Sequence, residues 1–259
     1  MAEGEAGSGL FVAEHAGLRS LQFDGLTVQS VMLLSEPDLL ALDYTRAMMG
    51  FLLFRPAPEH IVMIGLGGGS LAKYCLRHLP QTRFTAVEIN PEVIALRDRF
   101  GVPPDSERFR VVCGDGADFV RETAEAADVL LVDGFVAEGL PEGLGSVAFY
   151  ADCRRMLAPG GVLVTNHWAG DVRYSVYAAR LRAAFDDRVL AIGAEDGDNR
   201  VSFASKDGHF PPTRSEVLDR ARALVPGQGF DLAAIARRVD ERLVRQRRFM
   251  PGVRRGSGG

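Results

Sequence analysis

Four glycines between residues 65 and 69 separate an apolar run from a helical pattern. Residues 61–64 precede Gly65, Gly67, Gly68 and Gly69, and the segment SLAKYCLRHL follows. Because glycine has no side chain, such a turn adopts positive φ angles and lets another group approach its backbone closely. The first N–H groups of the following helix have no partner within that helix and face whatever lies above the turn. The pattern predicts a strand, a tight turn and a helix that together form a binding site.

An acidic residue, Glu88, ends the next apolar run, FTAVEIN, 23 residues after Gly65. At this spacing, a carboxylate at a strand end accepts hydrogen bonds from ribose hydroxyls. The glycine turn and the acid together predict a nucleoside-binding site. The alternative interpretation of the turn alone is a tight connection that binds nothing.

Strand and helix patterns alternate from residue 61 onwards, and the glycine turn and Glu88 lie at the ends of the first two predicted strands. The alternation predicts an α/β fold with a mostly parallel sheet and helices on both faces. A final hairpin is expected to add an antiparallel strand at one edge. The predicted strands cover residues 61–66, 84–89, 109–115, 128–134, 160–168, 188–195 and 200–206, and the predicted helices cover 70–79, 91–100, 116–125, 146–157 and 175–185.

The segments on either side of this alternation have other patterns. Residues 10–34 predict short antiparallel strands with a hairpin turn at Asp24-Gly25, and residues 39–54 have helical spacing. Two helices are predicted within residues 212–246, with a glycine break between them. The predicted organisation is a disordered tail (1–9), an N-terminal β region with a helix (10–58), a Rossmann-like nucleoside-binding domain (59–207), C-terminal helices (208–248) and a flexible basic tail (249–259).

Composition narrows the class of protein. The net charge of −4 gives no indication of nucleic-acid binding, and no apolar run is long enough to span a bilayer. The N-terminal segment MAEGEAGSG is neither a secretory signal nor a transit peptide. Cys75, Cys113 and Cys153 are widely spaced and predict buried free thiols in a reducing compartment, most simply the cytoplasm.

The chain resembles the spermidine synthase family in the segments VMIGLGGGS, AVEIN, VVCGDGADFV, DVLLVD and LAPGGVLV. The segments FDGLTVQS and ALDYTRAM resemble the hairpin and the tyrosine-containing helix of the same family. The family consists of aminopropyltransferases built on the class I S-adenosylmethionine-dependent methyltransferase fold. The resemblance covers about residues 10–205 and implies a Rossmann-like sheet with a small N-terminal antiparallel β-sheet.

The resemblance implies a nucleoside site made of matching residues. The methionine-derived part of the nucleoside is expected to lie above the glycine turn, which is formed by Gly65, Gly67 and Gly69. Glu88 is expected to bind the ribose hydroxyls. Asp115 and Gly116 match the pair that contacts adenine in the family. Gln29 and Tyr44 match the pair that borders the thioether and aminopropyl region. Asp115 is also expected to cap the helix that follows it.

The resemblance also identifies Asp133, at the end of the strand over 128–134, as the catalytic aspartate. In the implied reaction, an amine displaces methylthioadenosine at the carbon beside a sulfonium. A carboxylate there attracts the cationic amine and accepts its proton. The implied co-substrate is decarboxylated S-adenosylmethionine or S-adenosylmethionine, with no tightly bound cofactor and no metal. The expected partners are a small-molecule amine or other acceptor and, as often in the family, a second copy of the chain in a homodimer.

Four positions depart from the family pattern. Ser70 stands where an aspartate binds the aminopropyl ammonium, and Val136 stands where a second loop aspartate is usual. Arg46 replaces a glutamate and would repel a polycation if it points into the site. His167 lies where a carboxylate would help to bind a polyamine, although a structural histidine is the simpler interpretation, and Trp168 is expected in the core or in the pocket wall.

Three functions therefore compete. The first is an aminopropyltransferase with an altered polyamine site. The second is a methyltransferase that uses intact S-adenosylmethionine, because a carboxylated methionine tail has less need of an acid at Ser70. The third is a non-catalytic nucleoside-binding homologue that has lost the polyamine acids. A nicotinamide-dinucleotide enzyme explains the glycine motif alone but fits the closing hairpin less well.

Overall fold

The computed structural model describes residues 2–4, 9–23, 27–134, 139–195, 197–224 and 229–249. Several predictions fall outside these ranges: the turn at Asp24-Gly25, the loop position Val136, most of the glycine break between the C-terminal helices and the basic tail from residue 250 onwards. No helix in the described ranges is long and apolar enough to cross a membrane.

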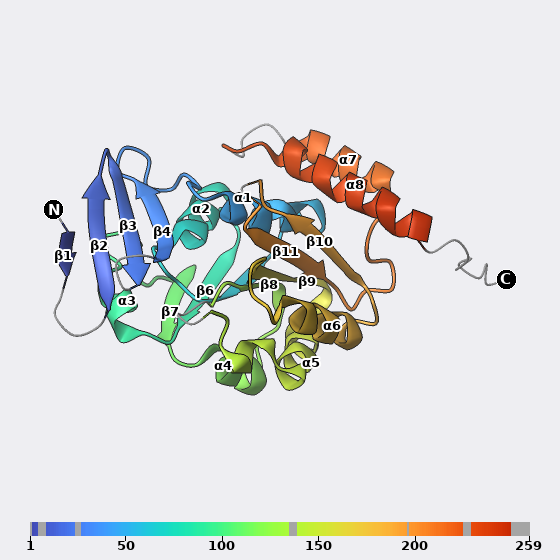
Figure 1. The fold of residues 1–259 in the computed structure, drawn as a ribbon, viewed down its shortest axis with the longest axis horizontal. Coiled ribbons are helices and arrows are strands. Elements are labelled where there is room, and N and C mark those ends of the chain that lie inside the picture. The colour runs from blue at the N-terminus through green and yellow to red at the C-terminus, as the bar shows by residue number, and fades with distance from the viewer. Residues whose placement is uncertain are drawn as a thin grey trace.

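A small antiparallel sheet forms the N-terminal end of the molecule, drawn in blue in Figure 1. Its strands, in spatial order, are β1 (Ala2–Gly4), β2 (Leu10–His15), β3 (Leu18–Phe23) and β4 (Thr27–Leu33). Where the sequence predicts a tail over residues 1–9, Ala2–Gly4 pair with β2. The turn between β2 and β3 has positive φ at both Ala16 and Gly17, as the twist of a two-residue hairpin requires.

The main sheet has seven strands in the order β10-β11-β9-β8-β5-β6-β7. These are β5 (His60–Ile64), β6 (Arg83–Glu88), β7 (Phe109–Cys113), β8 (Ala127–Val132), β9 (Leu157–Trp168), β10 (Val189–Gly193) and β11 (Asn199–Ala204). All pairs from β7 to β9 are parallel, whereas β11 is antiparallel to both β9 and β10. The predicted antiparallel strand therefore lies one position inside the edge, because the final hairpin turns back and its second strand pairs with β9.

Helices cover both faces of the main sheet. They are α1 (Asp43–Met48), η1 (Met49–Leu53), α2 (Ser70–His78), α3 (Pro91–Ala95), α4 (Gly116–Glu122), η2 (Glu142–Gly145), α5 (Val147–Met156), α6 (Tyr174–Ala184), α7 (Arg214–Leu224) and α8 (Leu232–Phe249). Strand β5 shows the division: Ile61 and Met63 pack with α1, α2 and the N-terminal sheet, and Val62 and Ile64 pack with α4, α5 and α6. Burial on both faces explains why the strand is apolar throughout.

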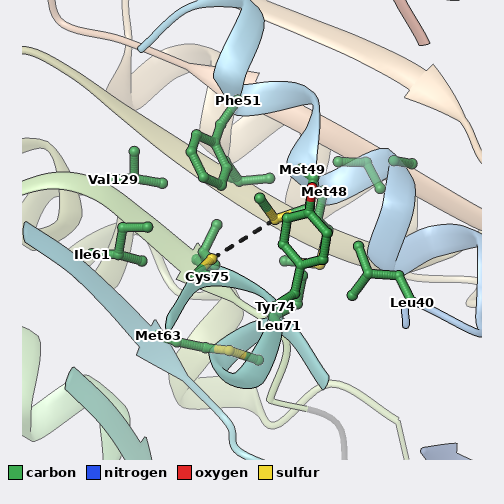
Figure 2. Close-up of a cluster of buried hydrophobic side chains, with 14 of the residues drawn as sticks. Leu40, Met48, Met49, Phe51, Ile61, Met63, Leu71, Tyr74, Cys75 and Val129 are labelled. Atoms are coloured by element: carbon green, nitrogen blue, oxygen red, sulfur yellow. Dashed lines mark hydrogen bonds between the residues drawn. The ribbon is translucent and has the colours of Figure 1, made fainter. Parts of the chain in front are cut away.

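The helical segment before the main sheet is shorter than the sequence predicts. A continuous helix was expected over residues 39–54, but α1 begins at Asp43 and changes to 3₁₀ geometry at Met49. The carbonyl groups of Leu40 and Ala41 accept hydrogen bonds from the Arg46 guanidinium, so they bond to a side chain instead of continuing the helix. Figure 2 shows how Met49 then reaches Cys75 of α2, with 3.9 Å between the two sulfur atoms.

The C-terminal helices α7 and α8 pack against η1 and β10 on the side away from the N-terminal sheet (Figure 1). Buried residues of α8, among them Leu232, Ile235 and Val239, extend the core cluster of that face. No described residue of either helix lines the large cleft considered next. The pair therefore covers part of the face of the main sheet that also carries α1 and α2, and it leaves the cleft at the strand ends open.

Candidate active site

A cleft of about 1400 Å³ lies at the carboxyl ends of the parallel strands, the edge where open α/β sheets bind ligands. Strands β5, β6, β8 and β9 end there, and β3 and β4 of the N-terminal sheet form the opposite wall. The volume exceeds the roughly 300–1,000 Å³ usual for one small molecule. Among the residues expected from the sequence, the cleft is lined by Gln29, Tyr44, Gly65, Gly67, Glu88, Asp115, Gly116 and Asp133.

Close packing within the protein explains two of the glycines in the turn after β5. Gly65 has a φ of +92°, and a Cβ there would overlap the carbonyl oxygen of Asp133 at the end of β8. Gly67 has a φ of +53° and faces more open space, with the nearest atom to an added Cβ at 3.8 Å. Gly69 does not line the cleft, and a side chain there would collide with Val102. The first two positions therefore present bare backbone to the cleft, and Gly69 lets α2 begin.

Glu88 ends β6 with its carboxylate held by backbone groups. One oxygen accepts a hydrogen bond from the N–H of Leu66 at 2.8 Å, and the other accepts from the N–H of Asn90 at 2.9 Å. The side chain is largely buried, yet the residue borders the cleft. A carboxylate has about four acceptor positions, so two remain for ligand hydroxyls.

Asp115 and Gly116 start α4 at the next strand end. One oxygen of Asp115 caps the helix by accepting from the N–H groups of Ala117 and Asp118 at 2.7 and 3.1 Å. Gly116 lets the helix start approach β5, since a Cβ there would overlap the Ile64 side chain. The predicted cap is thus present, and the exposed carboxylate still borders the cleft.

Asp133 lies at the centre of a polar network above β8. One of its oxygens accepts a hydrogen bond from the Asn166 amide at 2.9 Å, and its carboxylate also accepts from the Tyr44 hydroxyl. Burial raises the pKa of Asp133 above 3.8, and the two hydrogen bonds oppose that shift. Burial and the nearby Asp133 charge raise the pKa of Tyr44, so its phenol stays protonated and remains a donor. The Tyr44 oxygen lies 3.5 Å from the carbonyl oxygen of Gln29.

Two asparagines complete this network, and the sequence reasoning did not identify either. The Asn166 side-chain oxygen accepts a hydrogen bond from the Asn199 amide at 2.9 Å, which fixes the Asn166 amide so that its nitrogen faces Asp133. Both residues line the cleft. The signal in the sequence was a polar residue at the end of an otherwise apolar strand, beside the site expected at that edge.

The departures from the family pattern lie in different environments. Ser70 lines the cleft, and its hydroxyl oxygen lies 3.5 Å from that of Ser30. Arg46 forms an ion pair with Asp43 and bonds to carbonyls of its own segment, so it does not line the cleft. His167 also does not line the cleft, whereas Trp168 does.

His167 is a buried structural residue on the opposite face of β9. Its ring nitrogens lie 3.3 Å from the Tyr150 hydroxyl and 3.3 Å from the Thr165 hydroxyl, and its ring stacks on Tyr177. Burial lowers the pKa of His167 to about 4, so the ring is neutral at pH 7. The structure thus supports the structural interpretation and places no charge from this residue in the cleft. Within the described ranges, no group of three or more His, Cys, Asp or Glu side chains is arranged to hold a metal ion.

Comparison with known proteins relates most of this chain to one family. The spermine/spermidine synthase domain matches residues 42–178, more than half of the chain. The chain is 42% identical over 222 residues to a polyamine aminopropyltransferase of Neisseria meningitidis, covering 85% of this chain and 84% of the relative. It is 43% identical over 231 residues to a polyamine aminopropyltransferase of Chromobacterium violaceum, covering 89% and 88%.

Solved structures support the fold. A spermidine synthase in complex with the transition-state analogue AdoDATO has a TM-score of 0.74 at 18% identity, covering 96% of this chain and 88% of that one. Human methyltransferase-like protein 13 in complex with SAH has a TM-score of 0.65 at 24% identity, covering 76% and 93%. The predicted class I methyltransferase-like sheet with its small N-terminal antiparallel sheet is confirmed.

The two cleft-lining glycines with positive φ provide a matched test. Gly65→Ala is expected to reduce stability by more than about 3 kcal/mol, because the new Cβ meets backbone that cannot move aside. Gly67→Ala is expected to cost only about 1–2 kcal/mol, the usual penalty of a left-handed residue. Urea unfolding of both variants measures the difference, and equal losses would contradict the packing role of Gly65.

His167 predicts a pH dependence of stability. Because its pKa in the folded state, about 4, lies below 6.5, the unfolded chain binds the extra proton in that window and stability falls as the pH decreases from 6.5 towards 4. The full loss is about 3 kcal/mol, from roughly 1.4 kcal/mol per pKa unit. Urea unfolding at pH 7 and at pH 5 is expected to show a smaller drop for His167→Phe than for the parent protein. His209→Asn, at an exposed position, is the control and should leave the drop unchanged.

Proposed function

The chain belongs to the spermine/spermidine synthase family, and from this premise we propose that its cleft transfers an aminopropyl group from decarboxylated S-adenosylmethionine to a small amine. Family membership favours this transferase over the methyltransferase and the non-catalytic homologue. The observation that carries the proposal is the position of Asp133 between the glycine turn and Asn166, on a cleft large enough for both substrates.

The donor occupies the part of the cleft over β5, β6 and the start of α4. Glu88 accepts hydrogen bonds from the ribose hydroxyls, and Asp115 accepts one from the adenine amino group. The sulfonium then lies above Gly65 and Gly67, where no side chain intervenes. Gln29, Tyr44 and the hydroxyls of Ser30 and Ser70 border the aminopropyl group.

The transfer is a displacement at carbon. The neutral acceptor nitrogen forms a bond to the aminopropyl carbon beside the sulfonium, the carbon–sulfur bond breaks, and its electron pair stays on sulfur in methylthioadenosine. The acceptor nitrogen loses one proton, which the Asp133 carboxylate accepts. The raised pKa of Asp133 strengthens it as a base, while the bonds from Asn166 and Tyr44 hold it in place. Holding both substrates in line supplies a further part of the rate.

We further propose a cytoplasmic homodimer. All three cysteines are free, which suits a reducing compartment, and Cys75 and Cys153 are buried as expected, whereas Cys113 is exposed. Exposed apolar side chains at Leu18 in β3 and at Leu34 just after β4, both outside the cleft, favour association with a second copy. Sedimentation velocity at micromolar concentration is expected to give twice the chain mass, and a monomer mass would contradict the dimer.

Asp133→Asn tests the catalytic assignment. The variant is expected to form methylthioadenosine from decarboxylated S-adenosylmethionine and a diamine about 10²–10⁴-fold more slowly, the usual contribution of a general base. The pKa of Asp133 is raised above its ordinary value of 3.8, so the carboxylate becomes protonated at a higher pH than usual. In the parent protein, kcat/KM is therefore expected to fall more steeply as the pH decreases through this pKa. This additional slope should be absent in the variant.

The control for this test is Asp219→Asn, at an exposed acid on α7 outside the cleft. It should transfer at the parent rate. Calorimetric binding of methylthioadenosine is expected to be similar in all three proteins. A rate for Asp133→Asn within threefold of the parent, with methylthioadenosine bound normally, would reject Asp133 as the base.

A further inference from the structure

The cleft continues past Asp133 into a part that we call the outer arm, lined by Trp168, Gly170, Asp171, Val172, Asp198 and Asn199. The order of strands separates it from the proposed nucleoside residues. Glu88 and Asp115 lie at the ends of β6 and β7, Asp133 follows β8, and the outer arm extends from the end of β9 to the start of β11. A hydrogen bond of 2.7 Å from the N–H of Ala169 to the carbonyl of Asp198 joins its two sides. Asp133 therefore lies between the nucleoside region and the outer arm.

Trp168, the single tryptophan of the chain, lines the outer arm. Its neighbour Gly170 packs against the ring so closely that a Cβ on Gly170 would lie 2.5 Å from the indole. The residue is nevertheless 53% exposed. The close approach of Gly170 restrains the ring, and the rest of the side chain remains accessible where the residue lines the cleft.

The phase of β9 places this ring on the same side as the Asp133 network. Side chains alternate along a strand, so Asn166 and Trp168 share a face and lie about 7 Å apart along it. His167 points to the opposite face, where it contacts Tyr150 and Tyr177. Trp168 thus lies one pleat beyond the residue that holds Asp133, within reach of the far end of a short chain bound there.

The charged side chains of the outer arm do not repel a bound cation, because the positive charge of Arg173 is paired with Asp171. Arg173 is the only cation among the described residues that line the cleft. Its guanidinium bonds to both oxygens of Asp171 and lies 5.5 Å from the Tyr177 ring centre. The Asp171 charge is therefore already compensated by Arg173, and the Tyr177 ring already lies beside that guanidinium. The Trp168 ring is then the aromatic group of the outer arm that can contact a bound cation.

We propose that Trp168 binds the distal ammonium of a short alkyl diamine acceptor against its exposed indole face and so determines acceptor specificity. The inference rests on the proposed aminopropyl transfer. One nitrogen of the diamine loses its proton and reacts beside Asp133, while the second stays protonated. A cation within about 6 Å of an indole ring is attracted by the ring quadrupole, and more strongly when partly desolvated.

The test compares two acceptors, 1,4-diaminobutane and 1-aminobutane, which differ in the distal ammonium. The parent protein is expected to prefer the diamine in kcat/KM. Trp168→Leu should reduce the diamine-to-monoamine ratio by roughly three- to thirty-fold, mainly through KM of the diamine. Trp168→Phe, which keeps an aromatic face, should retain most of the preference. Val147→Ala is the control, at an apolar residue that is 63% exposed and lies outside the cleft.

Binding can be followed independently, because Trp168 is the only indole. Titration of 1,4-diaminobutane into the protein saturated with methylthioadenosine is expected to change the tryptophan emission over the same concentrations that saturate the rate. Constant emission over that range would overturn the proposal. So would an unchanged acceptor ratio in Trp168→Leu, or loss of the ratio in Asp198→Asn while Trp168→Leu retains it.

The two levels of inference fail separately. If the parent protein forms no methylthioadenosine with either amine, aminopropyl transfer itself is wrong. If it transfers to the diamine at a measurable rate and Trp168→Leu keeps the acceptor ratio, only the role of Trp168 is wrong.

Discussion

The site depends on one close approach between two backbones, at the tips of β5 and β8. Gly65 packs against the carbonyl of Asp133, and the N–H of Asp133 donates to the carbonyl of Ile64 at 2.9 Å. A side chain at Gly65 would separate these strand ends. The absence of a side chain therefore couples the glycine turn to the Asp133 carboxylate, so that the distance between them is set by main-chain packing and not by flexible groups.

Around this fixed point, the polar side chains form a directed series. Asn199 donates to Asn166, Asn166 donates to Asp133, and Tyr44 donates to the same carboxylate from the opposite wall. An amide group has a donor end and an acceptor end, so the bond from Asn199 determines which end of Asn166 faces Asp133. The carboxylate is then stabilised as an anion by neutral donors. Because neither Asn166 nor Tyr44 carries a positive charge, these two donors leave the negative charge of the carboxylate uncompensated.

Local features of the sequence predicted much of this site, and non-local ones did not. Gly65, Glu88, Asp115 and Asp133 each lie at the end of a strand or within two residues of it, so an alternating strand and helix pattern is enough to bring them to one edge. Asn199 could not be assigned in this way, because its place depends on the pairing of β11 with β9, whereas the sequence predicted the antiparallel strand at the edge. Arg46 was ambiguous for a similar reason, since its direction depends on which carbonyls the chain before α1 leaves open.

The phase of β9 explains why the sequence could not decide between His167 and Trp168. The strand is apolar on both faces, so hydrophobic alternation gives no phase, and a shift of one residue would exchange the two side chains. In the structure, the neutral His167 ring is fixed among Tyr150, Thr165 and Tyr177, and this burial sets the phase. Asn166 and Trp168 must then face the cleft. A buried residue that does not line the cleft thus helps to determine which side chains of β9 do line it.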